Sequence, residues 1–347
     1  MALTTVAAGN VVTQWDSKFW AEYVRGNRFK RYMGTDENSI IQLVEDLSVK
    51  KGGSVILPLV SKLSGAGVTG NGLLEGNEEA LANYDFEIAV DTLRHAVAVT
   101  DHEQQLTEIE LRAAAKTMLK LWAMEKMRDG LITALGSIDG VAYGSASAAQ
   151  KNTWTVNNAD RVLFGNSTAN YNATHSTALD ALDLTNDKCT RTTLELLRDI
   201  AETADPLIRP VSVGEDEETF VAFTGSKNFR NLKNDLETVH QDAMERGKSN
   251  PLFRDGDLMY DGIVIRKIPE IGTLTNVGST GTVDGQPIYL CGAQALGVAW
   301  AKRTKSTTDT RDYGFVKGVG IHEMRGIEKC RFNNKDHGIV TGFCAVA

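Results

Sequence analysis

One long excursion between Gly52 and Thr100 constrains this chain more than any other feature. Residues 53–60 and 84–90 have the composition of two strands, and the glycine-rich stretch 64–76 between them has no hydrophobic periodicity. Two strands joined by such a tip bury little apolar surface, and an isolated two-stranded hairpin is marginally stable in water. A chain that carries such an arm needs another molecule against which the arm can pack. The excursion therefore predicts a protein that assembles.

Composition sets the outer limits on function. An apolar fraction of 42% supports an ordinary folded core and excludes a disordered chain. The formal net charge of −8 argues against a protein whose main role is to grip nucleic acid phosphates, but it is compatible with a container that adheres weakly to its contents. The four cysteines form no C-x-x-C pair, so we expect free, mostly buried thiols in a reducing compartment. We expect neither a signal peptide nor a membrane span.

The order of elements predicts an α+β protein. Leu111, Ala115, Met118 and Trp122 recur at helical spacing, which predicts a long helix over about 105–135 with these side chains on its packed face. We expect this helix to begin directly after the second hairpin strand.

The rest of the chain mixes short elements. Residues 136–188 are rich in small and polar residues, which indicates loops and short strands. Thr192 and Glu195 stand in capping-box register for a second helix, and Ser226 is placed to cap a third. Buried-type strands are expected at the segments 220–224, 263–265, 288–291 and 296–300.

An aromatic stripe lies near the start of the chain. Trp15, Phe19, Trp20 and Tyr23 fall at helical spacing. The stripe fits equally well a piece of core or a docking face for another subunit, so Trp15, Phe19 and Trp20 are candidate inter-subunit contacts.

A Gly-x-Gly-x-x-Gly match occurs at 65–70 within the hairpin tip. A dinucleotide site requires that the third glycine open a helix, because the helix amides bind the pyrophosphate. Residues 71–76 contain two further glycines, which disfavour a helix. A flexible tip is the better interpretation, and a nucleotide-binding enzyme that uses Gly65–Gly70 stays as an alternative.

Residues with metal or catalytic potential are scattered. Asp101, His102 and Glu103 are adjacent, and neighbouring side chains on a strand point to opposite faces. No nucleophile elbow, phosphate loop or zinc-protease motif is present in the sequence. We therefore expect no catalytic residues, no metal and no cofactor. The acidic run 215–218 is expected to be a solvated loop.

Two groups of segments resemble a known family in the right order along the chain. The first group comprises residues 52–54, 57–59, 63–65, 70–79 and 94–97, and the second comprises 312–314, 318–321, 326–329, 332–333 and 336–340. Together they are similar to tailed-phage major capsid proteins of the group typified by the N-four-type podophage. The stretch 136–190 carries the weakest similarity.

The resemblance implies the Hong-Kong-97-type capsid fold. It divides the chain into an N-terminal arm (1–50), an extended hairpin called the E-loop (51–88), a peripheral domain with a spine helix (89–139), an axial domain (140–300) and a return to the peripheral domain with C-terminal strands (301–347).

The resemblance also implies a function and its partners. The protein would self-assemble into hexamers and pentamers of an icosahedral shell around the double-stranded DNA of a tailed phage. A separate scaffolding protein and a portal would be partners, and a decoration protein would be an optional one, with weak, non-specific DNA contacts and no membrane. Synthesis and assembly would take place in the host cytoplasm. An encapsulin-type shell or another assembling protein stays as an alternative.

The acidic cluster of the hairpin tip gives the remaining candidate contacts. Glu75, Glu78 and Glu79 are close together in a segment without a core of its own. We expect them to meet basic groups on an adjacent subunit, although glutamates beside glycines are also common on free surfaces.

Overall fold

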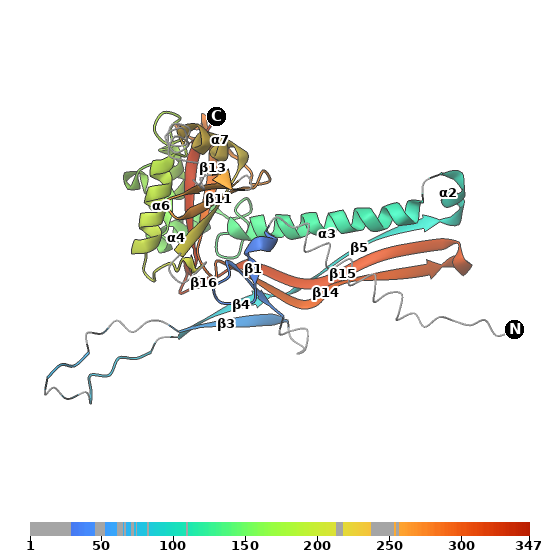
Figure 1. Cartoon of the computed structure of the whole chain (residues 1–347), viewed down its shortest axis with the longest axis horizontal. Coiled ribbons are helices and arrows are strands. Elements are labelled where there is room, and N and C mark those ends of the chain that lie inside the picture. Colours follow the sequence, from blue (N-terminus) through green and yellow to red (C-terminus); the bar gives the residue numbers. More distant parts are fainter. Residues whose placement is uncertain are drawn as a thin grey trace.

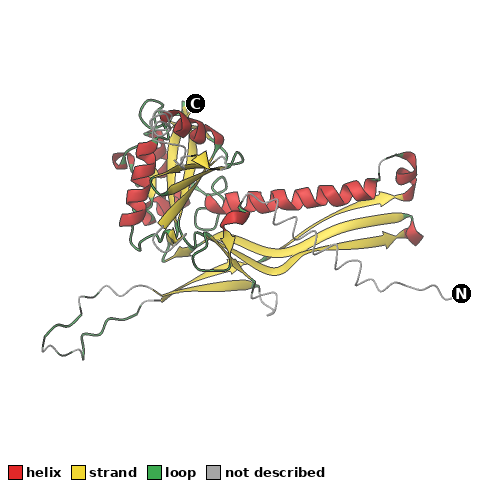
Figure 2. Cartoon of the chain, viewed as in Figure 1, coloured by secondary structure: helices red, strands yellow, loops and turns green. Residues whose placement is uncertain are grey.

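The computed structural model describes residues 29–45, 53–60, 65, 67–70, 73, 75–81, 83–108, 110–212, 218–236, 253–254 and 257–347. Figure 1 shows that this chain is built from a compact part, an elongated part and a hairpin arm that extends away from both. Figure 2 shows helices gathered on the compact part and one long helix running along the elongated strands.

The elongated part is a five-stranded sheet in the order β1-β2-β14-β15-β5. Its strands are β1 (Met33–Gly34), β2 (Ile41–Val44), β5 (Asp91–Thr100), β14 (Leu296–Arg311) and β15 (Val316–Lys329). Strand β15 is antiparallel to both β14 and β5, so the three longest strands form its body. The turn between β14 and β15 contains the short helix η4 (Asp312–Gly314), and η1 (Lys30–Tyr32) precedes β1.

A strand precedes the long helix, which corrects one expectation. We expected a helix directly after the hairpin, but residues 91–100 form β5, and the helices α2 (Asp101–Leu106) and α3 (Leu111–Leu135) follow. The period-two signal was present in the sequence, because Leu93 and Val97 alternate with the exposed Arg94 and Ala98. The expected single helix is also divided, since Thr107 has an extended backbone at the end of α2.

The packed face of α3 agrees with the prediction at Ala115 and Trp122 but not at Met118. The buried row is Ala115, Leu119, Ala123 and Met127, whereas Met118 is 59% exposed. Both rows have helical spacing, so periodicity alone could not choose between them. The small side chains of Ala115 and Ala123 allow the helix to approach the sheet closely.

The compact part is a nine-stranded sheet with helices packed against it. The main path runs β6-β18-β13-β8-β11-β10-β9, and β12 and β7 pair with β13 and β8. Its strands are β6 (Val162–Phe164), β7 (Val211–Ser212), β8 (Glu218–Thr224), β9 (Phe253–Arg254), β10 (Asp257–Tyr260), β11 (Ile263–Lys267), β12 (Leu274–Gly278), β13 (Val283–Cys291) and β18 (Ile339–Val346). The expected core strands at 220–224, 263–265, 288–291 and 296–300 are confirmed.

Helices of the compact part correct several details. They are α4 (Ala148–Asn157), α5 (His175–Asp180), α6 (Arg191–Thr203) and α7 (Ser226–Asp235), with the short helix η3 (Thr168–Asn170). The segment 136–188 therefore contains two α-helices in addition to the expected loops and strand. A Ser147–Gln150 capping box begins α4, and this pair of residues could have predicted the start of the helix from the sequence.

The caps of α6 and α7 also differ from those predicted. Thr190 caps α6 in a capping box with Thr193, whereas Glu195 accepts a hydrogen bond from the Tyr260 hydroxyl at 2.7 Å. Gly225 is the N-cap of α7, and Ser226 is its first helical residue.

The last strand returns to the compact sheet. Residues 301–347 were expected to return to the elongated part, and β14 and β15 do lie there. Strand β18, however, pairs along its length with β13, from Asp284 opposite Val346 to Cys291 opposite Ile339. Its eight residues are all buried, so it needs a position covered on both faces, which the compact sheet provides.

Candidate assembly surfaces

The hairpin arm is a two-stranded sheet of its own. Strands β3 (Ser54–Val60) and β4 (Asn83–Ala89) pair antiparallel in unbroken register. Among the described residues of the arm, a core is present at its base, where Val55, Phe86 and Ile88 pack against Ala299 of β14 and Cys330, which follows β15.

Two glycines let the arm cross the elongated sheet. A Cβ added to Gly326 would lie 2.0 Å from the Ala89 carbonyl oxygen, and one added to Gly297 would lie 2.4 Å from Ile88 Cδ1. At Gly326 the two backbones therefore meet at a distance that only glycine permits, whereas at Gly297 the Ile88 side chain occupies the space of a Cβ. This contact fixes the direction in which the arm leaves the molecule.

Beyond its base the arm is exposed. Ile56 and Val60 on β3 are 58% and 59% exposed, and Leu73 and Leu81 of the tip are 76% and 59% exposed. None of the described elements covers these apolar side chains, so the arm is a candidate surface for contact with another molecule.

The tip acids have contacts within their own arm. Glu79 Oε2 accepts a hydrogen bond from the Gly65 amide at 2.7 Å, which joins the two sides of the tip. Glu78 Oε2 accepts from the Gly76 amide at 2.8 Å. These bonds leave negative charge at the surface, because all three glutamates, including Glu75, are exposed.

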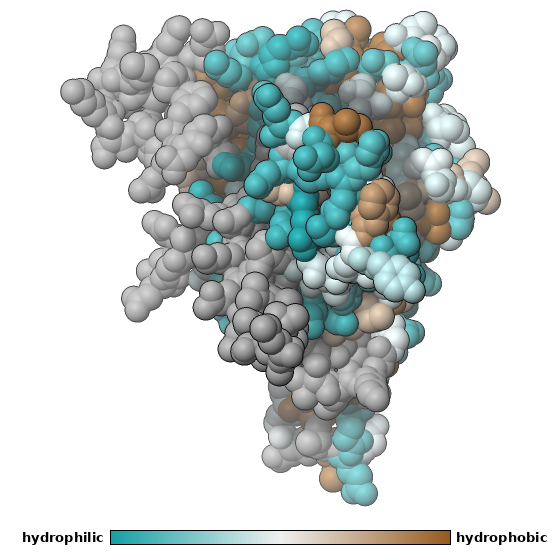
Figure 3. Space-filling model, turned by 90° about the vertical axis from the view of Figure 1, so that its right-hand side faces the viewer, coloured by the Kyte–Doolittle hydropathy of each residue, from teal (hydrophilic) through white to brown (hydrophobic). Residues whose placement is uncertain are grey.

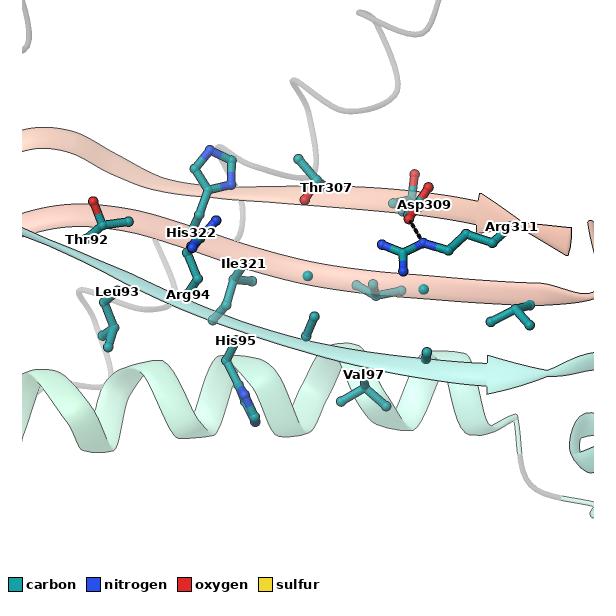
Figure 4. Close-up of a pocket in the computed structure, with 17 residues that line it drawn as sticks. Thr92, Leu93, Arg94, His95, Val97, Thr307, Asp309, Arg311, Ile321 and His322 are labelled. Atoms are coloured by element: carbon teal, nitrogen blue, oxygen red, sulfur yellow. Dashed lines mark hydrogen bonds and ion pairs between the residues drawn. The ribbon is translucent and has the colours of Figure 1, made fainter.

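A groove lies on the face of the elongated sheet that α3 does not cover. In Figure 4, His95 and Val97 point toward the helix, whereas Arg94 and His322 project from the sheet away from it. The groove has a volume of about 1170 Å³, and small residues form its floor: Ala96, Ala98, Gly318 and Gly320. Side chains of this size leave the strand backbones open to a close approach.

One end of this groove is basic. His322 is the cross-strand neighbour of both Lys305 and Arg94, so three basic residues form one row across β14, β15 and β5. Lys305 and Arg94 are exposed. Further along, the Arg311 guanidinium is paired with Asp309 (Figure 4). The row is complementary in charge to the tip of the arm.

The buried His175 has structural partners at both ring nitrogens. His175 Nδ1 and Nε2 lie 2.9 Å from the hydroxyls of Thr155 and Tyr143. The Thr155 hydroxyl donates to the Lys151 carbonyl, so it accepts from Nδ1–H, and Nε2 accepts from Tyr143. Burial, reinforced by nearby Lys151, lowers the pKa of His175 to about 4. The imidazole is thus neutral and fully bonded inside an aromatic cluster.

The described residues contain no group of three or more potential ligands that could hold a metal ion. The tip loop shows Gly67 and Gly70 with φ of 69° and 68°, and the residues described after it, 73 and 75–81, contain no helix. The helix that a dinucleotide site requires is therefore missing from that part of the tip. Trp15, Phe19, Trp20 and the run 215–217 lie outside the described residues.

Comparison with known proteins decides the family. Residues 3–345 match the model of a family described as phage capsid protein.

The chain belongs to the phage capsid protein family.

Individual relatives agree. The capsid protein in the asymmetric unit of cyanophage Pam1 is 38% identical, with a TM-score of 0.86 over 100% of both chains. The major capsid protein of Pseudomonas phage KPP25 is 27% identical over 96% of this chain and 94% of the relative. The capsid of Ralstonia phage GP4 shares the fold, with 24% identity and a TM-score of 0.75 over 100% of this chain and 99% of that one.

This capsid protein is therefore a bacteriophage major capsid protein, a structural subunit of the shell of the virion, with the Hong-Kong-97-type fold. The expected Hong-Kong-97-type fold and the expected role as a major capsid protein are confirmed. Many copies associate to form such a shell, so the exposed arm and the basic groove are candidate surfaces for contact between copies.

Proposed function

We propose that the hairpin arm of each subunit lies on the open sheet face of its neighbour and so links subunits into hexamers and pentamers of an icosahedral shell. The observation that carries this proposal is the two-stranded arm, which has a core only at its base and exposed apolar side chains beyond it. A neighbouring subunit supplies the surface that the arm lacks.

Charge complementarity supports the choice of docking surface. The arm carries Glu75, Glu78 and Glu79 at its tip, and the groove carries the basic row formed by Lys305, His322 and Arg94. Exposed ion pairs contribute only about 0–1 kcal/mol each. A shell repeats the contact many times, so weak pairs still set the subunit concentration at which assembly begins.

We assign the parts of the fold accordingly. The arm (51–88) is the E-loop, the elongated sheet with α3 is the peripheral domain, and the compact part is the axial domain at the capsomer centre. The N-terminal segment 1–50, with Trp15, Phe19 and Trp20, contributes further contacts between subunits.

The proposed contents and partners follow from the family. The shell encloses the double-stranded DNA of a tailed phage, a separate scaffolding protein guides assembly in the host cytoplasm, and a portal completes the particle. The net charge of −8 keeps adhesion to DNA weak. No described helix is long and apolar enough to cross a membrane.

The protein acts without catalytic turnover in this proposal. Native mass spectrometry of the purified chain should show the mass of the polypeptide alone. A stoichiometric nucleotide or zinc ion would contradict this part of the proposal and favour the enzyme alternative.

Electron microscopy of the purified full chain tests the assembly itself. Closed particles with hexameric and pentameric capsomers are expected. A protein that stays monomeric across protein concentration, salt and added scaffolding protein would contradict the proposal.

A further inference from the structure

The turn between β14 and β15 has an unusual backbone. Asp312, Tyr313 and Gly314 have φ values of 51°, 51° and 100°. Glycine adopts such angles readily, and aspartate tolerates them, but a bulky residue there is an outlier. The Tyr313 side chain is also fully exposed. Neither the backbone nor packing against the described part of the subunit explains a tyrosine at this position, so a role outside the subunit is indicated.

Neighbouring contacts hold this turn in place. The Phe315 carbonyl accepts a hydrogen bond from the Asp101 amide at 2.8 Å, and Lys317 Nζ lies 2.9 Å from Asp101 Oδ1. The turn is thereby tied to the first residue of α2. Because these contacts already restrict the turn, less conformational entropy is lost when Tyr313 binds a partner.

Further exposed apolar groups lie at the same end of the elongated part as Tyr313. Leu106 on α2 is 72% exposed and Phe315 is 46% exposed. Figure 1 places α2 and the β14–β15 turn at the same end. Figure 3 looks onto this side of the molecule and shows a few hydrophobic side chains among mainly hydrophilic ones.

A pocket lies at the same end, between α2, the start of α3 and the end of β5. Its volume is about 460 Å³, and its lining includes Thr100, Gln104, Glu110, Arg112 and Lys116. A cavity of roughly 150 Å³ is enough to bind benzene, so a phenol ring fits here. Cationic side chains attract the face of an aromatic ring, and carboxylates accept a phenol O–H.

We propose that Tyr313 of one copy inserts into the α2–α3 pocket of a second copy. The contact is heterologous, because Tyr313, the knob of one subunit, meets a pocket on the next subunit. Since knob and pocket lie at the same end, copies related by a rotation axis near that end close into a ring rather than an open chain. The inference rests on the proposed function, since it requires several copies side by side, and it adds a contact that does not use the hairpin arm.

Substitution of Tyr313 separates this role from a purely local one. Glycine relieves the backbone at φ 51°, so Tyr313→Gly should leave the subunit at least as resistant to urea as the wild type. The same change should raise the protein concentration needed for assembly at least tenfold, measured by sedimentation velocity. Tyr313→Phe keeps the ring and should assemble at nearly the wild-type concentration. Leu207→Ala removes a 55% exposed apolar side chain on the compact part and should assemble normally.

Cysteine pairing tests the proposed partner directly. The Tyr313→Cys variant is mixed with the Ala113→Cys variant, because Ala113 lines the pocket. Diamide then accepts two electrons and two protons as two thiols form one disulfide. The four native cysteines are buried and free, and burial raises the pKa of the Cys189, Cys291 and Cys330 thiols, which keeps them unreactive. The mixture should yield a covalent dimer that neither variant gives alone.

The outcomes distinguish a failure of the Tyr313 contact from a failure of shell assembly itself. Unchanged assembly of Tyr313→Gly, or a dominant Tyr313→Cys homodimer, overturns the knob-and-pocket contact while the shell stands. If the wild-type chain forms no higher-order species at any concentration, the proposed function fails first.

Discussion

Lys329 Nζ lies 2.6 Å from Asp336 Oδ2, and the two side chains are only 1% and 2% exposed. Lys329 ends the elongated strand β15, whereas Asp336 is bonded to the compact part: its Oδ2 accepts from Trp154 Nε1 at 3.0 Å, and its amide donates to Asn158 Oδ1 at 2.8 Å. Arg161 donates to the Asp336 carbonyl at 2.6 Å. This ion pair joins the two parts of the subunit.

Removing the carboxylate should be costly. Asp336→Ala leaves the Lys329 charge buried without its partner, which typically costs about 3–5 kcal/mol of stability. Urea unfolding followed by circular dichroism measures the change. The matched control is Lys335→Ala, because the Lys335–Asp160 pair is about one-third exposed on each side and should contribute less than about 1 kcal/mol. Equal effects of the two substitutions would show that the buried pair is not a structural junction.

The crossing of the arm should depend on Gly326. Gly326→Ala forces a Cβ toward the Ala89 carbonyl, so it should destabilise the subunit by about 1–3 kcal/mol and loosen β4. Hydrogen exchange of residues 83–89 reports the loosening. Gly144 has open space where a Cβ would be placed, and Gly144→Ala should change neither stability nor exchange. Wild-type exchange in Gly326→Ala would refute the role of this contact.

Stability should fall in mild acid because of His175. Its folded pKa is about 4, whereas an unfolded histidine titrates near 6.5. Between these values the unfolded chain binds a proton that the folded chain excludes, so stability rises with pH through this window and this contribution levels off above it. The histidine accounts for about 3 kcal/mol across the window.

Urea titrations at several pH values measure the slope of the unfolding free energy against pH and identify the residues that cause it. His175→Gln should reduce the slope between pH 4 and 6.5. Burial also lowers the pKa of His337 to about 4, so the double variant with His337→Gln should reduce it further. A slope that is the same in all three proteins would exclude the histidines as its origin.

Charge at the arm tip should govern assembly. Reversal of Glu75, Glu78 and Glu79 to lysine should block or misdirect shell formation while circular dichroism shows a folded subunit. Glutamine at all three positions keeps acceptors for the Gly65 and Gly76 amides but removes the charge, and should raise the assembly threshold less. Normal shells from the lysine variant, detected by sedimentation, would mean that the cluster is only a solvated loop.

The sequence predicted the parts of the fold that rest on local pattern. The hairpin, the long helix and the strands at 220–224 and 288–291 follow from periodicity and glycine content, and all are present. The choice between Met118 and Leu119 as the packed residue of α3 depends on which side the sheet lies, and periodicity carries no such information.

The candidate surfaces were predicted less completely. The acidic tip could be identified from composition, but the basic row could not, because Arg94, Lys305 and His322 are brought together by strand pairing over more than 200 residues. Lys329 and Asp336 are close in the sequence, but their burial could not be predicted, because it depends on the distant residues Trp154 and Asn158. Tyr313 stands out only once its backbone angle and exposure are known.

A cryo-electron microscopy map of the assembled shell, at a resolution that shows side chains, would reveal where the arm lies. We expect density for residues 65–81 of one subunit over the groove floored by Ala96 and Gly320 of its neighbour, with the tip acids beside Arg94 and His322. A closed shell in which the arm packs on its own subunit, or in which this groove is empty, would contradict this expectation.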